Sequence, residues 1–266
     1  MSKRNKFILW CGFVAVTSFW MWASVQTWLE GSLFEVQISA NLIVLAILFI
    51  ILMSLLSVGF IIFQNRLWSI GFSLVIGILY LVLFGVSNLN LAGVFMAVML
   101  FYHAQDIMVG EVKERIKMNS RLLIKKGLAN FIVAFFILMS FAAYQSPAIE
   151  EFKNIKQLPS SSEIFVKTIV EQAVEAQLNE ASQEQKELVL NQAAREIVSR
   201  INSFLRPYFQ YVPPALAFGL FLVLWSVGWI FVLLSAFLGM FIFWIFRKIK
   251  FFTIVERDVK AEVIVI

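Results

Sequence analysis

The sequence contains little of what soluble enzymes and disulfide-rich proteins depend on. Its 266 residues include one cysteine, Cys11, and one histidine, His103, and only 15% of them are charged. A single cysteine has no partner within the chain, which excludes an intramolecular disulfide framework. A single histidine leaves few soft ligands, so we expect no metal site. The low charge also excludes a disordered, highly solvated chain.

Sequence motifs for common catalytic chemistry are absent as well. The chain has no glycine-rich phosphate loop, no His-Glu-x-x-His, no Cys-x-x-Cys and no Gly-x-Ser-x-Gly. It also has no pair of aspartates within two apolar runs and no ladder of arginines. We therefore expect a protein that is not an enzyme, with no catalytic residue and no cofactor.

The sequence is rich in apolar residues. Hydrophobic residues make up 61% of the chain, with 28 Phe and 8 Trp, against about 45–50% in soluble proteins. They fall into six runs long enough, at about 20 residues, to cross a bilayer as helices. The runs are approximately 7–28, 38–63, 67–86, 89–109, 127–144 and 213–247. The sequence predicts an all-α polytopic membrane protein with six transmembrane helices, whose partner is the lipid bilayer.

Basic residues are concentrated on one side of these runs. Lysine and arginine flank alternate ends of the spans, at Lys3, Arg4, Lys6, Arg66, Lys113, Arg115, Lys117, Arg121, Lys125, Lys126, Arg247, Lys248, Lys250, Arg257 and Lys260. The opposite short loops, 29–37 and 87–88, carry no basic residue. The positive-inside rule then predicts that both termini are cytoplasmic. The net charge of +5 reflects this asymmetry, so we expect no nucleic-acid partner. Compact loops favour a plasma membrane of bacterial type.

The longest polar segment, 145–212, is predicted to lie outside the cytoplasm between the fifth and sixth spans. Ser162 can cap a helix over 163–178, and Ser182 with Gln185 fits a capping box that opens a second helix over 183–205. The second helix carries an apolar stripe of Leu190, Ala194, Ile197, Ile201 and Phe204. We expect an extracytoplasmic helical hairpin with too little core to be stable alone. It can cap its own bundle, or contact a protein partner or a second copy through 160–205.

The remaining regions follow from these spans. Residues 1–144 form a five-span membrane region with a basic cytoplasmic loop at 110–126, which lies in the interface plane or extends the fourth helix. The sixth helix, 213–247, is long: the run of about 32 residues that follows Pro213 and Pro214 spans about 48 Å, against a core near 30 Å. It must tilt strongly or project beyond the bilayer. Residues 248–266 form a cytoplasmic tail.

The sharpest candidate for a polar membrane site is at the predicted cytoplasmic end of the fourth span. His103 and Asp106 are three residues apart and share a helical face. Such a pair can serve a proton relay, an ion site or, less readily, a metal. The position favours an interfacial pair with no catalytic task, because polar side chains reach water cheaply at a span end.

Two further patterns concern helix packing and the position of tryptophans in the membrane. Ser69, Ser73 and Gly77 recur every four residues, and Ser235 and Gly239 repeat the spacing, which is typical of close helix contacts. Tryptophans near the span ends predict interfacial belts, with Trp20, Trp22 and Trp28 at the outer face and Trp68 and Trp244 at the inner one.

Two hypotheses for function remain open at this point. The first is a non-enzymatic assembly or scaffolding component that interacts through its extracytoplasmic hairpin. The alternative is a small transporter or channel subunit that uses His103 and Asp106 near a cytoplasmic mouth.

Overall fold

Six long helices make up most of the computed structural model, which describes residues 2–30, 40–114, 120–147, 149, 192–193, 196–204 and 208–253. The helices are α1 (Lys3–Glu30), α2 (Ala40–Ile62), α3 (Arg66–Phe84), α4 (Asn88–Glu114), α5 (Ser120–Tyr144) and α9 (Val212–Lys248), with a 3-10 turn, η1, at Phe209–Tyr211. All six are long and apolar enough to cross a membrane. The described residues contain no strand. The prediction of an all-α polytopic membrane protein with six spans is confirmed.

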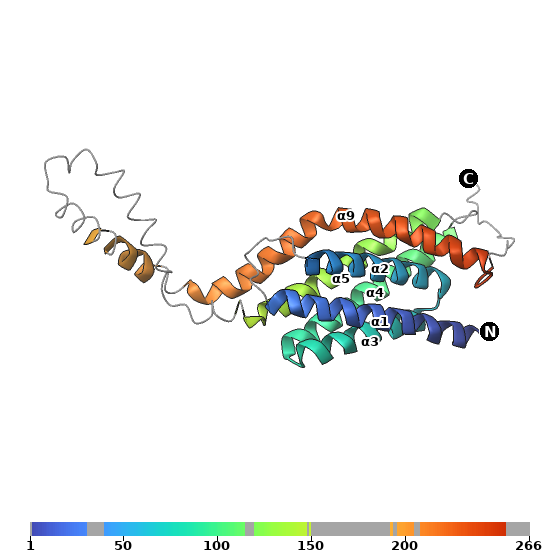
Figure 1. Ribbon diagram of the computed structural model, residues 1–266, viewed down its shortest axis with the longest axis horizontal. Helices are drawn as coiled ribbons and strands as arrows, with labels where there is room; N and C mark the ends of the chain where they lie inside the picture. The colour runs from blue at the N-terminus through green and yellow to red at the C-terminus, as the bar shows by residue number, and fades with distance from the viewer. Residues whose placement is uncertain are drawn as a thin grey trace, which may run out of the picture. The chain divides into compact units, whose positions relative to one another are not determined.

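The helices α1 to α5 lie side by side as a bundle (Figure 1). The most extensive contacts are those of α4 with α5, of α1 with α2 and α3, and of α3 with α4. The N-terminal end of α1 and the C-terminal end of α9 lie at the same end of this bundle (Figure 1). Short connections at 63–65 and 85–87 make α2, α3 and α4 successive antiparallel neighbours.

Helix ends occur where the local sequence favours them. The Asn65 side chain accepts a hydrogen bond from the Leu67 amide and caps the start of α3. Gly85 ends that helix with a φ of 81°, a conformation that other residues adopt only with strain. Pro213 and Pro214 occupy the first turn of α9, where a missing N–H costs no hydrogen bond.

Aromatic rings fill the interior of the bundle. Trp22 of α1 contacts Tyr80 and Phe84 of α3 and stacks on Phe135 of α5, with ring centroids 5.3 Å apart in the stacked pair. Trp22 is fully buried, so its predicted place in an outer interfacial belt is wrong. Trp20, by contrast, is exposed. The two residues differ because residues two apart on a helix point about 200° apart, one to the bundle and one outward.

The predicted small-residue contacts occur in the bundle. A Cβ added to Gly77 would lie 2.6 Å from Val94 Cγ1, so α3 and α4 approach closely here. The Ser54 hydroxyl of α2 donates to the backbone oxygen of Ser235 in α9 at 3.0 Å. A Cβ on Gly239 would lie in ordinary contact with Ile124 and the Ser54 backbone. Small residues therefore allow α9 to pack against α2 and α5.

The basic segment 110–126 is largely helical where it is described. Helix α4 continues through Glu114, and α5 begins at Ser120, seven residues before the predicted span. Helix α4 thus extends past the predicted span end at 109, whereas residues 120–126 belong to α5. The predicted placement of the whole segment, in the interface plane or as an extension of the fourth helix, stays a prediction. Most of the predicted tail 248–266 lies outside the described residues.

Residues 149–216 form a compact unit separate from the rest of the chain. Within it, residues 196–204 are helical, in agreement with the predicted helix over 183–205. The predicted helix over 163–178 and the turn that follows it lie outside the described residues, so the hairpin itself stays a prediction.

Candidate functional site

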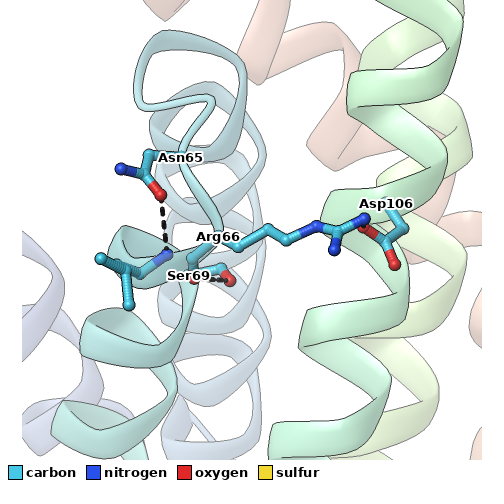
Figure 2. A network of polar contacts seen from close by, with 5 residues as sticks. Asn65, Arg66, Ser69 and Asp106 are labelled. Atoms are coloured by element: carbon cyan, nitrogen blue, oxygen red, sulfur yellow. Dashed lines mark hydrogen bonds and ion pairs between the residues drawn. The ribbon is translucent and has the colours of Figure 1, made fainter.

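The C-terminal half of α4 carries an ion pair with the start of α3. Arg66 extends from the first residue of α3 toward α4, where its Nη2 lies 2.7 Å from Asp106 Oδ1 (Figure 2). The side chains are 62% and 36% exposed, respectively. Pairs this open to solvent contribute about 0–1 kcal/mol to stability. The ion pair therefore connects α3 with α4 at the surface, and it is not a buried pair of charges.

Local contacts position Arg66 for this role. The Ser69 hydroxyl donates to the Arg66 backbone oxygen at 2.7 Å, next to the Asn65 cap (Figure 2). The guanidinium carbon lies 5.4 Å from the centre of the Tyr102 ring, one turn before Asp106 on α4. A cation at the N-terminus of a helix is unfavourable with respect to the helix dipole. Asp106 and the Tyr102 ring offset that cost.

The two residues predicted as a site have different surroundings. Asp106 contacts Arg66 from the neighbouring helix, whereas His103 is exposed. Spacing on one helix therefore identified the acidic residue, while its cationic partner comes from another helix. A functional role for His103 and Asp106 stays a prediction.

Gln105, between these two residues, faces the opposite way and is fully buried. Its Nε2 lies 3.5 Å and 3.4 Å from the backbone oxygens of Phe60 and Phe63 at the end of α2. The last carbonyls of a helix have no partner within that helix. Gln105 covers two of them, and its Oε1 has no hydrogen-bond partner among the described residues.

A second polar cluster joins the opposite ends of α3, α4 and α5. The Tyr80 hydroxyl lies 2.8 Å from Asn90 Oδ1 and 3.2 Å from the Leu138 oxygen, both of which can accept its hydrogen. Gln145 Nε2 donates to the same Asn90 oxygen at 2.6 Å, and the Ser87 hydroxyl donates to Gln145 Oε1 at 2.9 Å.

Asn90 is the centre of this cluster and is fully buried. Its Nδ2 donates to the backbone oxygens of Phe84 and Gly85, at 3.1 Å and 2.9 Å, which secures the end of α3. This cluster was not predicted from the sequence. The available signal was the presence of polar residues at the adjoining ends of three successive spans.

In the Asn90 cluster, the hydroxyl and amide groups satisfy one another. Hydroxyl and amide groups that already exchange hydrogen bonds have little capacity left for a substrate. Among the residues that the structure describes, no group of three His, Cys, Asp or Glu side chains is arranged to hold a metal ion. Both clusters connect neighbouring helices.

Comparisons with protein families, with curated proteins and with solved structures find no match to this chain.

Proposed function

We propose that this multi-pass membrane protein is a non-enzymatic assembly or scaffolding component that interacts through the extracytoplasmic segment 160–205. The observation that carries the proposal is the exposure of apolar side chains on helix 196–204. Ile197 is 38% exposed and Phe204 is 71% exposed. Both belong to the apolar stripe of the predicted second hairpin helix. The free energy falls when a partner covers apolar side chains that a helix exposes to water outside the bilayer.

The length of α9 supports the same proposal. Its 37 residues extend about 55 Å at 1.5 Å per residue. Even at a tilt of about 40°, the upper end of the usual range, a hydrocarbon core of about 30 Å accommodates only about 26 residues.

The part of α9 outside the hydrocarbon core is on its N-terminal side, since Arg247 and Lys248 mark the cytoplasmic end. That part includes apolar residues from Val212 to Phe218. Phe218 is exposed. A helix that carries apolar side chains beyond the core provides a further surface for another protein.

We place the protein in a plasma membrane of bacterial type with both termini in the cytoplasm. Six spans return the chain to its starting side, and the ends of α1 and α9 meet through a hydrogen bond from Lys6 to the Phe251 oxygen. The basic flanks of alternate spans support the cytoplasmic assignment of that side.

A transporter or channel subunit has less support. That alternative requires Asp106 to be available to His103 or to an ion, whereas the Asp106 carboxylate is paired with Arg66.

The experiment is the removal or alteration of the extracytoplasmic segment. Deletion of 160–205 is expected to abolish self-association or co-purification with partner proteins while membrane insertion is retained. Crosslinking in native membranes followed by mass spectrometry identifies what is lost. The double variant Ile197→Ser/Phe204→Ser should weaken the same crosslinks. Ser203→Ala, on the same helix, is the matched control. Complexes that are unchanged after the deletion would contradict the proposal.

A further inference from the structure

The N-terminal end of α1 and the C-terminal end of α9 together form one basic cluster. These two ends are far apart in the sequence. Lys6 Nζ of α1 donates to the backbone oxygen of Phe251, which follows α9, at 2.6 Å. The same ammonium lies 5.2 Å from the centre of the Phe251 ring. One turn further along α1, the Trp10 ring contacts Phe246, with centroids 4.9 Å apart. Residues more than 230 positions apart in the sequence are thus neighbours.

This contact places six basic residues at one end of the α1–α9 junction. They are Lys3, Arg4, Lys6, Arg247, Lys248 and Lys250, which we call the terminal basic cluster. All except Lys6 are exposed. The helix ends that carry them, 2–6 and 246–252, contain no aspartate or glutamate.

The terminal basic cluster differs from the other basic residues at the same end of the bundle. Arg66 is paired with Asp106, and Lys126 is paired with Glu111. None of the ion pairs within the described part of the chain involves the terminal basic cluster. Like charges that are brought to the same end of a bundle repel one another, and a bound anion would compensate this repulsion.

Helix geometry adds to the demand for an anion. The first turn of α1 has basic residues and no acidic one, although the N-terminus of a helix favours negative charge. A phosphate near this turn would be attracted both by the side chains and by the helix end. Lysine and arginine are the side chains that bind phosphate in proteins.

The side chains next to the cluster favour a lipid over a soluble anion as its ligand. Large apolar side chains on the adjoining turns of both helices are exposed: Ile8, Leu9 and Phe13 on α1, and Phe241 and Trp244 on α9. Lys248 Nζ lies 5.1 Å from the centre of the Trp244 ring, an arrangement typical of the headgroup level. Acyl chains can cover the apolar side chains while the phosphate contacts the cluster.

We propose that the terminal basic cluster binds the headgroup of an anionic glycerophospholipid and that this lipid holds α9 against α1. Clusters of basic residues at the cytoplasmic end of membrane helices are suited to anionic headgroups, and each basic residue contributes about 1 kcal/mol near the surface. The lipid thus compensates the repulsion between two ends of the chain that tertiary folding has joined.

The test is native mass spectrometry of the full-length protein, delipidated in neutral detergent and titrated with phosphatidylglycerol or phosphatidylcholine. The wild type is expected to bind phosphatidylglycerol preferentially. The variant Arg247→Gln/Lys250→Gln should bind it about 30-fold more weakly, as expected for the loss of two interfacial charges. The control Arg121→Gln/Lys125→Gln removes two exposed charges from α5 and should leave the affinity within about threefold, because those residues lie outside the cluster.

Three results would overturn the proposal. Equal binding of the two lipids by the wild type would show that the headgroup charge is not recognised. An equal loss of affinity in the control would show attraction to cytoplasmic charge in general. Inorganic phosphate that displaces phosphatidylglycerol at equal concentration would assign the cluster to a free anion instead of a lipid.

Discussion

At the scale of single residues, polar side chains in this protein join helix ends. Gln105 contacts the last carbonyls of α2, and Asn90 contacts those of α3. In lipid, a helix end that enters the bundle interior has no water to satisfy its carbonyls. An amide side chain from the next helix replaces the water and fixes the distance between the two helices.

The Tyr80 hydroxyl provides a direct measure of the Asn90 cluster. Tyr80→Phe is expected to lower the free energy of unfolding by about 1 kcal/mol, a typical value for one hydrogen bond between membrane helices. Asn90→Ala should cost more, because Asn90 bonds to Tyr80, Gln145 and two backbone oxygens. Unfolding by SDS in mixed micelles measures both changes.

Tyr102→Phe is the matched control for Tyr80→Phe. It keeps the ring over which the Arg66 guanidinium lies, so we expect little change. A loss in Tyr102→Phe as large as that in Tyr80→Phe would show that the measured change is not specific to the Asn90 cluster.

The Arg66–Asp106 ion pair is predicted to be weak. A double-mutant cycle of Arg66→Gln and Asp106→Asn should give a coupling energy below about 1 kcal/mol, since both side chains reach solvent. The Lys126–Glu111 pair should couple more strongly, because the Glu111 side chain is only 12% exposed. His103→Ala should leave the Arg66–Asp106 coupling unchanged. A coupling energy that changes in His103→Ala would instead support the predicted His103–Asp106 site.

At the scale of helices, close packing depends on a few small residues. Gly77→Ala would place a Cβ 2.6 Å from Val94 Cγ1, so either the Val94 side chain or the two helices must shift. We expect a loss of about 1–3 kcal/mol in unfolding free energy, as for other overpacked sites. Equilibrium unfolding in mixed micelles measures it.

Gly110→Ala on α4 provides the comparison. Nothing lies within 4 Å of a Cβ at Gly110, and alanine is favoured over glycine in a helix by about 1 kcal/mol. The variant should be as stable as the wild type or more so. Equal destabilisation by the two substitutions would contradict the close contact of α3 and α4 at Gly77.

The helices also differ in how much of their surface the bundle covers. In the most apolar 18-residue window of each span, 61% of the α5 residues are buried but only 22% of those in α9. Helix α5 is therefore central, whereas α9 contacts the bundle along one narrow face. A peripheral helix held by few contacts benefits most from a bound lipid or a protein partner.

At the scale of the whole molecule, the orientation in the membrane is open to direct test. In a Cys11→Ser background, Ser182→Cys is expected to react with a membrane-impermeant maleimide in intact cells. Ser2→Cys and Lys260→Cys should react only after permeabilisation, because the proposed topology places both termini in the cytoplasm. Labelling of Ser2→Cys in intact cells would invert the proposed topology.

The sequence by itself determined the class, the six spans and the approximate span ends, because a bilayer imposes the same length and polarity on every segment that crosses it. It could not determine which helix face meets which. Trp20 and Trp22 look equivalent in sequence, yet only Trp22 is buried. The partner of Asp106, the Asn90 cluster and the meeting of Lys6 with Phe251 depend on contacts between helices distant along the chain. Such contacts are decided by the packing of whole helices, and local spacing carries no information about them.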